Sequence, residues 1–279
     1  MKTFKGKAIY NPNGKAGEYS YWACKFYVGC SNGCTYCYCK KGVLATQMGG
    51  DTPTLKKCFK SEEHALEVFE RELKTNLPEL QKHGLFFSFT TDQFLKETEY
   101  LTTAASFIAI KNGVPVKILT KIAFDEDYFL APFRMAWLKN KIPYYKDVVK
   151  KYIAFGFTLT GHDELEPNAS TNAERIEAMR KLHEEGFKTF ASLEPIIDIR
   201  STCQMFEEVY RFCDLLKIGL ESGKKYNSVD LRKMILSLTE QYPSKAKIYF
   251  KDRLLKQAGI NRSDLPENCV GMDYNMFNQ

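Results

Sequence analysis

The sequence predicts an α/β fold, organised as a partial (β/α)6 TIM-like barrel in a single domain. Apolar runs alternate with helix-like segments along the whole chain of 279 residues, and no linker interrupts the alternation. Strands that alternate with helices of this length are typical of a parallel sheet with crossover helices. There is room for six or seven such units, which is fewer than the eight of a closed barrel. We therefore expect one domain over 1–279, with a C-terminal segment at 245–279 that completes the edge of the barrel.

The expected strands are short runs rich in β-branched and aromatic residues, and each run ends in polar residues. They lie at 21–28, 85–89, 116–119, 152–159, 188–193, 215–218 and 247–250. An open, doubly wound sheet is the alternative arrangement, although no Gly-x-Gly-x-x-Gly motif follows any of these runs. Active sites of parallel α/β folds lie at the C-terminal ends of the strands, so the polar residues there are the candidates for function.

The expected helices lie between these strands, at 61–77, 98–112, 126–140, 172–185, 202–213 and 228–241. Two of them have clear end signals. Thr171 and Glu174 are spaced as a capping box, and Gly186 supplies a stop for the helix that they begin. Ser61 is placed to cap another helix, and Pro78 closes it.

Composition narrows the classes of protein to consider. No apolar run approaches the roughly 20 residues that a membrane-spanning helix needs. The basic start of the chain lacks the apolar stretch of a signal peptide. We therefore expect a cytoplasmic protein with no membrane contact. In that reducing environment, nine cysteines indicate metal binding or catalysis rather than a disulfide framework.

The net charge of +6 is unevenly distributed along the chain. Residues 1–60 contain ten lysines against only Glu18 and Asp51, a balance of +8, whereas the remaining 30 basic and 32 acidic residues give −2. One interpretation is a surface that attracts nucleic acid or an acidic electron donor. The other is a set of ordinary solubilising lysines.

Three cysteines close together in the sequence, Cys30, Cys34 and Cys37, form the strongest chemical signal. They lie in a loop at 29–40, directly after the first expected strand. Thiolates are soft ligands that suit zinc, copper(I) or iron–sulfur clusters. A four-iron cluster held by three protein thiolates keeps one iron without a protein ligand, and an open position of this kind is typical of a reactive metal site.

A structural zinc site is the alternative use of this loop, with Cys24 or Cys39 as the fourth ligand. Zinc-binding cysteines usually come as two pairs, and no second pair with matching spacing occurs in the chain. The spacing therefore favours the cluster.

The cysteine spacing, with the aromatic Tyr36 just before the third cysteine, resembles the signature of the radical S-adenosylmethionine (SAM) superfamily. Within this superfamily the chain looks like the branch that contains spore photoproduct lyase and its short, phage-associated relatives. The segments that carry this likeness are 29–38, 89–93, 118–121, 165–170, 192–195 and 219–223. The chain departs from the lyase in length, and no counterpart of the lyase's hydrogen-donating cysteine is identified.

This resemblance implies an enzyme with two cofactors, a 4Fe–4S cluster and SAM. One electron from a donor such as flavodoxin or ferredoxin would cleave SAM to a 5′-deoxyadenosyl radical, which would abstract a hydrogen atom from the substrate. A nucleobase in DNA or RNA is the implied substrate, and the basic N-terminal segment agrees with nucleic acid as a partner. A peptide or a small metabolite is the alternative substrate. The alternative from another class of protein is a metal-binding interaction module that catalyses no reaction.

The resemblance also implies roles for polar residues at the strand ends. Thr90, Thr91 and Asp92 are expected to accept hydrogen bonds from the methionine ammonium, and Lys121 to pair with the methionine carboxylate. The alternative for each is a turn cap or a solvated side chain at the barrel mouth. The further candidates for cofactor contact are Tyr36, Thr158 and Thr160, with both threonines placed for the ribose hydroxyls, and Glu194 and Glu221, which suit hydroxyl or amine groups.

Overall fold

The chain folds around one large parallel sheet, in a computed structural model that describes residues 3–131, 145–241 and 246–278. The strand order is β1-β2-β5-β6-β7-β8-β9-β10. β1 (Ile9–Tyr10) is antiparallel to β2 (Ala23–Cys24), and every later neighbour pairs in parallel. The other strands are β5 (Leu85–Phe87), β6 (Val116–Thr120), β7 (Ile153–Thr158), β8 (Lys188–Ile196), β9 (Leu215–Leu220) and β10 (Lys247–Phe250). This arrangement confirms the predicted α/β fold class and its partial barrel.

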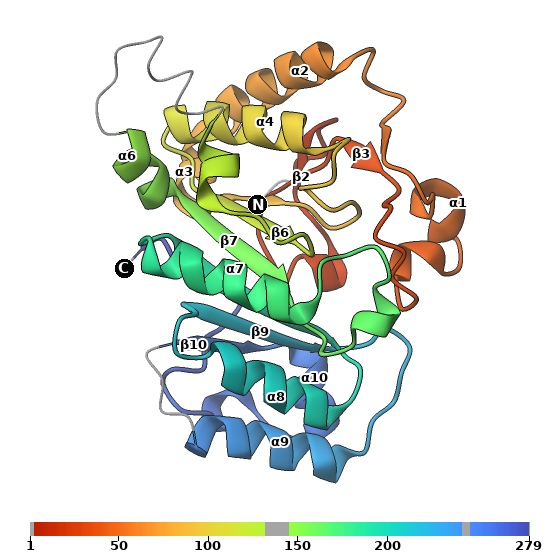
Figure 1. Ribbon diagram of the computed structural model, residues 1–279, viewed down its shortest axis with the longest axis vertical. Coiled ribbons are helices and arrows are strands. Elements are labelled where there is room, and N and C mark those ends of the chain that lie inside the picture. Colours follow the sequence, from red (N-terminus) through yellow and green to blue (C-terminus); the bar gives the residue numbers. More distant parts are fainter. Residues whose placement is uncertain (1–2, 132–144, 242–245, 279) are drawn as a thin grey trace.

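The helices follow the strands in order, from α2 and α4 at the top of Figure 1 to α8 and α9 at the bottom. Crossover helices of this kind connect parallel strands and cover the sheet. Their bounds are α1 (Leu44–Met48), α2 (Glu62–Thr75), α3 (Leu77–His83), α4 (Glu99–Lys111), α6 (Tyr145–Tyr152), α7 (Asn172–Glu184), α8 (Ile199–Val209), α9 (Ser228–Gln241) and α10 (Asp252–Ala258). Within the described residues, no helix combines the length and the apolar character needed to cross a membrane.

The two faces of the sheet bury different sets of side chains. Phe87 and Ile218 belong to the large core cluster that the helices also enter, whereas Phe86 and Leu215 belong to a second, smaller cluster. Successive strand residues point to opposite faces, so this alternation is what a sheet covered on both sides requires. The smaller cluster fills the inner face of the barrel below the strand ends.

Two of the helix signals work as predicted. Ser61 accepts a hydrogen bond from the His64 amide and caps α2, and Thr171 with Glu174 forms the capping box of α7. Pro78 lies beyond the end of α2 as expected, but it also stands in the first turn of a new helix, α3. Proline is tolerated there because the first amides of a helix have no acceptor within the helix.

The first expected strand, 21–28, is two strands in the structure. β2 ends at Cys24, and β3 (Tyr27–Val28) pairs with β4 (Thr54–Leu55) in a separate antiparallel ribbon. The ribbon turns the chain away from the main sheet and toward the cysteine loop. β8 continues to Ile196, beyond the expected end at 193, through an irregularity in its pairing with β9. The expected helix at 126–140 lies partly outside the described residues, and its described part, 126–131, is helical.

Candidate active site

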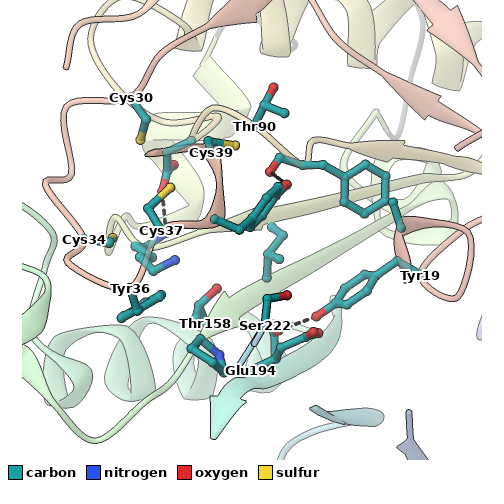
Figure 2. Close-up of a pocket in the computed structure, with 18 of the residues that line it drawn as sticks. Tyr19, Cys30, Cys34, Tyr36, Cys37, Cys39, Thr90, Thr158, Glu194 and Ser222 are labelled. Carbon is teal, nitrogen blue, oxygen red and sulfur yellow. Dashed lines mark hydrogen bonds between the residues drawn. The ribbon is translucent and has the colours of Figure 1, made fainter. Parts of the chain in front are cut away.

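The three cysteines predicted to bind metal line one cavity at the C-terminal ends of the parallel strands. Figure 2 shows Cys30, Cys34 and Cys37 on one side of it, with Tyr19 and Glu194 on the other. Residues at or just after the C-terminal ends of β5, β6, β7, β8 and β9 line most of the remaining wall, together with residues of the 15–19 segment and Lys251. The cavity therefore lies where the fold class predicts an active site.

The cysteine loop is held from two sides by segments far away in sequence. The Cys30 amide donates to the Gly50 carbonyl (2.9 Å), and the Thr35 amide donates to the Leu165 carbonyl (3.0 Å). Gly33 has a φ of +72°, and a Cβ there would lie 3.0 Å from the ring of Pro167. Only glycine adopts this backbone conformation easily and leaves the space that the proline fills. The segment 165–170, which carried part of the family resemblance, thus serves as a support for the loop.

The three thiols differ in their electrostatic surroundings. Burial raises the pKa of Cys30 to about 11 and also raises that of Cys34. A hydrogen bond from Cys39 outweighs burial at Cys37 and lowers its pKa to about 6. A hydrogen bond to the charged form of a group favours that form. Cys37 is therefore the most readily ionised of the three in the absence of metal.

The two candidates for a fourth zinc ligand lie in different surroundings, and Cys39 lines the same cavity as the three loop thiols. Cys24, one candidate for a fourth ligand, is fully buried in β2 and belongs to the core. Within the described residues, no three His, Cys, Asp or Glu side chains are grouped so as to hold a metal ion. A single zinc ion needs all of its ligands within about 2.3 Å of one point. Thiols that face a shared cavity instead suit a larger inorganic group.

Asp92 forms hydrogen bonds with the cysteine loop, with the end of β6 and with the segment that follows β5. Its carboxylate accepts hydrogen bonds from the Asn32 side-chain amide (2.8 Å), the Thr120 hydroxyl (2.5 Å) and the backbone amides of Lys121 (2.7 Å) and Phe94 (3.1 Å). It lines the cavity. However, four donors from the chain already engage its two oxygens, so it connects the cysteine loop to the ends of β5 and β6.

Thr90 and Thr91 lie next to Asp92 in the sequence, but their side-chain oxygens are unpaired among the described residues whereas those of Asp92 are paired. The hydroxyl oxygens of both are buried and have no hydrogen-bond partner among the described residues. Both residues line the cavity. Buried polar groups are normally hydrogen-bonded, so unpaired hydroxyls in a cavity indicate a ligand or ordered water.

Lys121 lies on the cavity wall at the end of β6. Its ammonium is 4.0 Å from a Glu166 carboxylate oxygen and 5.6 Å from the centre of the Tyr36 ring. Burial lowers the pKa of Lys121, but the charges of Cys34, Glu166 and Asp92 outweigh burial and hold this pKa above its ordinary value. Lys121 is therefore a permanent positive charge beside the cysteine loop.

Behind Lys121 lies a buried network that sequence reasoning missed. Glu166 accepts hydrogen bonds from the Tyr36 hydroxyl and from the Arg175 guanidinium, and the side chains of Glu166 and Arg175 are fully buried. Arg175 also donates to the Thr158 carbonyl (2.6 Å). Tyr36 lines the cavity with its ring while its hydroxyl points into this network. Arg175 looks like an ordinary polar helix residue in the sequence, which has no signal for its burial.

The opposite end of the cavity contains a second set of paired groups. Glu194 forms an ion pair with Lys251 (2.8 Å), and Glu221 forms one with Lys41 (3.1 Å). Tyr19 hydrogen-bonds to Ser192. Both glutamates line the cavity, and each already has a partner from the chain.

The two threonines predicted to contact ribose are separated by the fold. Thr158, the last residue of β7, lines the cavity. Thr160 is buried in the loop beyond it, where its hydroxyl accepts from the His162 amide (3.3 Å) and its own amide donates to Asn172 (3.0 Å). Thr160 is not one of the residues that line the cavity in the described part of the chain. Successive strand positions alternate between faces, but the chain has left β7 at Thr160, so a two-residue spacing no longer predicts a shared face.

The open parallel barrel and the thiol-lined cavity at its strand ends define an α/β barrel protein with a candidate cluster site. The family model described as the radical SAM superfamily matches residues 24–213 of the chain. This match covers the cysteine loop and every strand from β3 to β8, and the chain belongs to the radical SAM superfamily. Members of this superfamily are enzymes that use SAM and a 4Fe–4S cluster.

Solved structures show the same fold. Streptococcus suis SuiB bound to S-adenosylmethionine matches with a TM-score of 0.55 and 11% identity, over 83% of this chain and 50% of that one. SuiB alone matches with a TM-score of 0.53 and 12% identity, over 90% and 52%. SuiB bound to the precursor peptide SuiA matches with a TM-score of 0.53 and 12% identity, over 84% and 50%. This chain thus spans about half the length of the solved structures it matches. No curated protein matches the chain.

The residues around the cavity fit these two cofactors. Within the described residues, four thiols line the cavity, and Cys30, Cys34 and Cys37 among them have the spacing of the family signature and are the soft ligands that a cluster needs. A hydrogen bond with Cys37 and burial raise the pKa of Cys39 well above its ordinary value, so Cys39 is the thiol least ready to ionise and bind metal. A cluster held by the other three would leave a fourth iron without a protein ligand. The unpaired hydroxyls of Thr90 and Thr91 can accept hydrogen bonds, and Lys121 offers a positive charge. These groups match the amino and carboxylate groups of an amino acid.

Proposed function

We propose that this chain is a radical SAM enzyme that binds a 4Fe–4S cluster through Cys30, Cys34 and Cys37 and cleaves SAM reductively. The observation that carries the proposal is the convergence of these three thiols on one cavity with the unpaired hydroxyls of Thr90 and Thr91. When bound, the cluster would supply the single electron that reductive cleavage of the C5′–S bond of SAM requires, with methionine and a 5′-deoxyadenosyl radical as the two products.

The chain's own residues bind and orient SAM in this proposal. Lys121 pairs with the carboxylate of the methionine part of SAM. The hydroxyls of Thr90 and Thr91 accept hydrogen bonds from the α-amino group of that methionine part. Thr158, Glu194 and Glu221 line the cavity farther along and are candidates for the ribose and the substrate. SAM bound there would supply the group that abstracts a hydrogen atom from the substrate, and 5′-deoxyadenosine would be released. Enclosure of the radical in a cavity between strand ends limits its side reactions with water.

Anaerobic reconstitution with iron and sulfide tests this proposal. We expect visible absorbance from a cluster, and we expect 5′-deoxyadenosine when dithionite and SAM are added. Reduced flavodoxin or ferredoxin, the proposed natural donors, should replace dithionite. A reconstituted protein without a cluster, or one with a cluster that never cleaves SAM, would contradict the proposal.

For the substrate, we propose a nucleobase in DNA or RNA and membership of the branch that contains spore photoproduct lyase. Two features support this. The segments that resemble that branch supply the cysteine loop and its support, together with Asp92, Lys121, Glu194 and Glu221. The first 60 residues also have a charge balance of +8. Binding to oligonucleotides should therefore weaken steeply as salt rises, since phosphate contacts release counterions. Absence of binding at low salt would exclude this substrate class.

A peptide is the second candidate substrate. One structure with a similar fold, SuiB, is described in complex with a precursor peptide. The likeness between this chain and SuiB is one of fold alone. A peptide substrate predicts that oligonucleotides do not increase the rate of 5′-deoxyadenosine formation, whereas a nucleobase substrate predicts that they do.

A further inference from the structure

Asn32 lies inside the cysteine loop, between Cys30 and Cys34, and is one of the residues that line the same cavity. The residue is only 2% exposed. Its amide nitrogen donates to the Asp92 carboxylate over 2.8 Å, while its amide oxygen, Oδ1, is buried without a hydrogen-bond partner among the described residues. One end of this amide is therefore anchored and the other is free.

The orientation of the Asn32 amide follows from the chemistry of its partner. An ionised carboxylate can only accept hydrogen bonds, so the amide must present its NH2 group to Asp92. The other three groups on the Asp92 carboxylate, from Thr120, Lys121 and Phe94, are all donors, as an ionised acceptor requires. A flipped amide would place two oxygens against each other. Asp92 thus fixes the Oδ1 atom of Asn32 as the unpaired end.

The surroundings of this oxygen indicate what would satisfy it. Three oxygens without partners belong to residues that line the cavity, Asn32 Oδ1 and the hydroxyls of Thr90 and Thr91. Lys121, whose backbone amide also donates to Asp92, lines the same cavity with a positively charged side chain. An amide oxygen can only accept, so its ligand must bring an N–H or O–H group. The α-amino group of an amino acid is such a donor, and its carboxylate would face the lysine.

We propose that Asn32 is a SAM-binding residue whose Oδ1 accepts a hydrogen bond from the α-amino group of SAM, and that Asp92 is a positioning residue that orients this amide. The inference rests on the proposed function and assigns a role to a residue within the cysteine loop itself. It also explains why Asp92, although it lies where an acceptor for the amino group is expected, has its carboxylate turned to donors of the chain.

The test compares SAM binding by reconstituted Asn32→Ala and Asn32→Ser with that of the unchanged protein, by equilibrium dialysis under anaerobic conditions. The matched control is Ser31→Ala, one position earlier in the same loop. We expect the dissociation constant for SAM to rise about tenfold in both Asn32 variants, the effect of one hydrogen bond to a charged or polarised partner. Iron and sulfide content should stay unchanged in all three variants.

A SAM analogue with hydrogen in place of the α-amino group separates recognition from structure. If Asn32 binds that amino group, the analogue should bind equally well to the unchanged protein and to Asn32→Ala, because the partner has been removed from both. An unchanged affinity for SAM in the variants overturns the inference. A penalty that persists with the analogue, or loss of the cluster in both Asn32 variants, overturns it as well. Failure of the unchanged protein to bind a cluster or cleave SAM would instead contradict the proposed function.

Discussion

Arg175 and Glu166 form an ion pair whose two side chains are both completely buried behind the cysteine loop. Glu166 also accepts a hydrogen bond from the Tyr36 hydroxyl, and the Lys121 ammonium lies 4.0 Å from the Glu166 carboxylate. The pair therefore joins α7 to the loop and to the wall of the cavity. Removing one member of a buried pair leaves an uncompensated charge in the interior.

Glu166→Gln should consequently lower the free energy of unfolding by about 3–5 kcal/mol, the usual consequence of removing one member of a buried pair. Denaturant titration of the purified chain measures this change. The matched control is Glu177→Gln on the exposed face of α7, where the pair with Arg180 is open to solvent and contributes little. Equal effects of the two substitutions would contradict the structural role of Glu166.

Alanine at Cys30, Cys34 or Cys37 should abolish cluster assembly, since each removes one of only three thiolate ligands. Iron and sulfide analysis after anaerobic reconstitution measures the result. Cys269→Ala serves as the control, because Cys269 pairs with Ile248 beside β10, away from the cavity. A full cluster content in any of the three loop variants would exclude that cysteine as a ligand.

Lys121→Met should raise the dissociation constant for SAM by about 10- to 100-fold, as expected for the loss of a hydrogen bond between charged groups. The cluster content should remain, since Lys121 is not a thiol ligand. Lys181→Met, on the exposed surface of α7, is the matched control and should bind SAM normally. Unchanged affinity in the Lys121 variant would show that the carboxylate binds elsewhere.

Gly219 lies in β9 beneath the Glu194–Lys251 pair. A Cβ there would lie 2.7 Å from Lys251 Cδ and 2.8 Å from Glu194 Cδ, so Gly219→Ala must displace the pair. Overpacking of this kind reduces stability by about 1–3 kcal/mol. Gly50→Ala is the control, since the nearest atom to its added carbon is 3.7 Å away. Denaturant titration of both variants should show a loss only for Gly219→Ala.

His162 predicts a pH dependence of stability. Burial lowers the pKa of His162, but its contacts with Glu164 (2.7 Å) and Asp198 (2.6 Å) outweigh burial and raise it. The protonated imidazole is therefore favoured in the folded state. Its contribution is complete below the ordinary pKa of about 6.5 and is lost as the pH rises through the raised value. The urea concentration at the midpoint of unfolding should therefore decline as the pH rises above about 6.5, and His162→Gln should reduce this decline. A decline of equal size in the variant would disprove this linkage.

The sequence alone was sufficient for the fold class and for the cysteine loop, and eleven of the twelve candidate site residues that it indicated line the cavity. Short apolar runs and helix caps are local patterns, so the strands from β5 to β10 and the ends of α2 and α7 follow from neighbouring residues. The three thiols are close in sequence, and their spacing indicated a soft-metal site before any fold was known. The branch of the superfamily and the nucleobase substrate stay predictions.

Only the tertiary structure decided which polar groups are free and which are already paired. Asp92 and the Thr90 hydroxyl look alike as candidates in the sequence, yet the first accepts hydrogen bonds from residues as distant as Asn32 and Thr120 while the second has no partner among the described residues. The tertiary structure likewise decided that Arg175 is buried against Glu166 and that Thr160 lies apart from the cavity. Pairing depends on which strand ends and loops meet in space, and a pattern along one segment has no information about its partners in another.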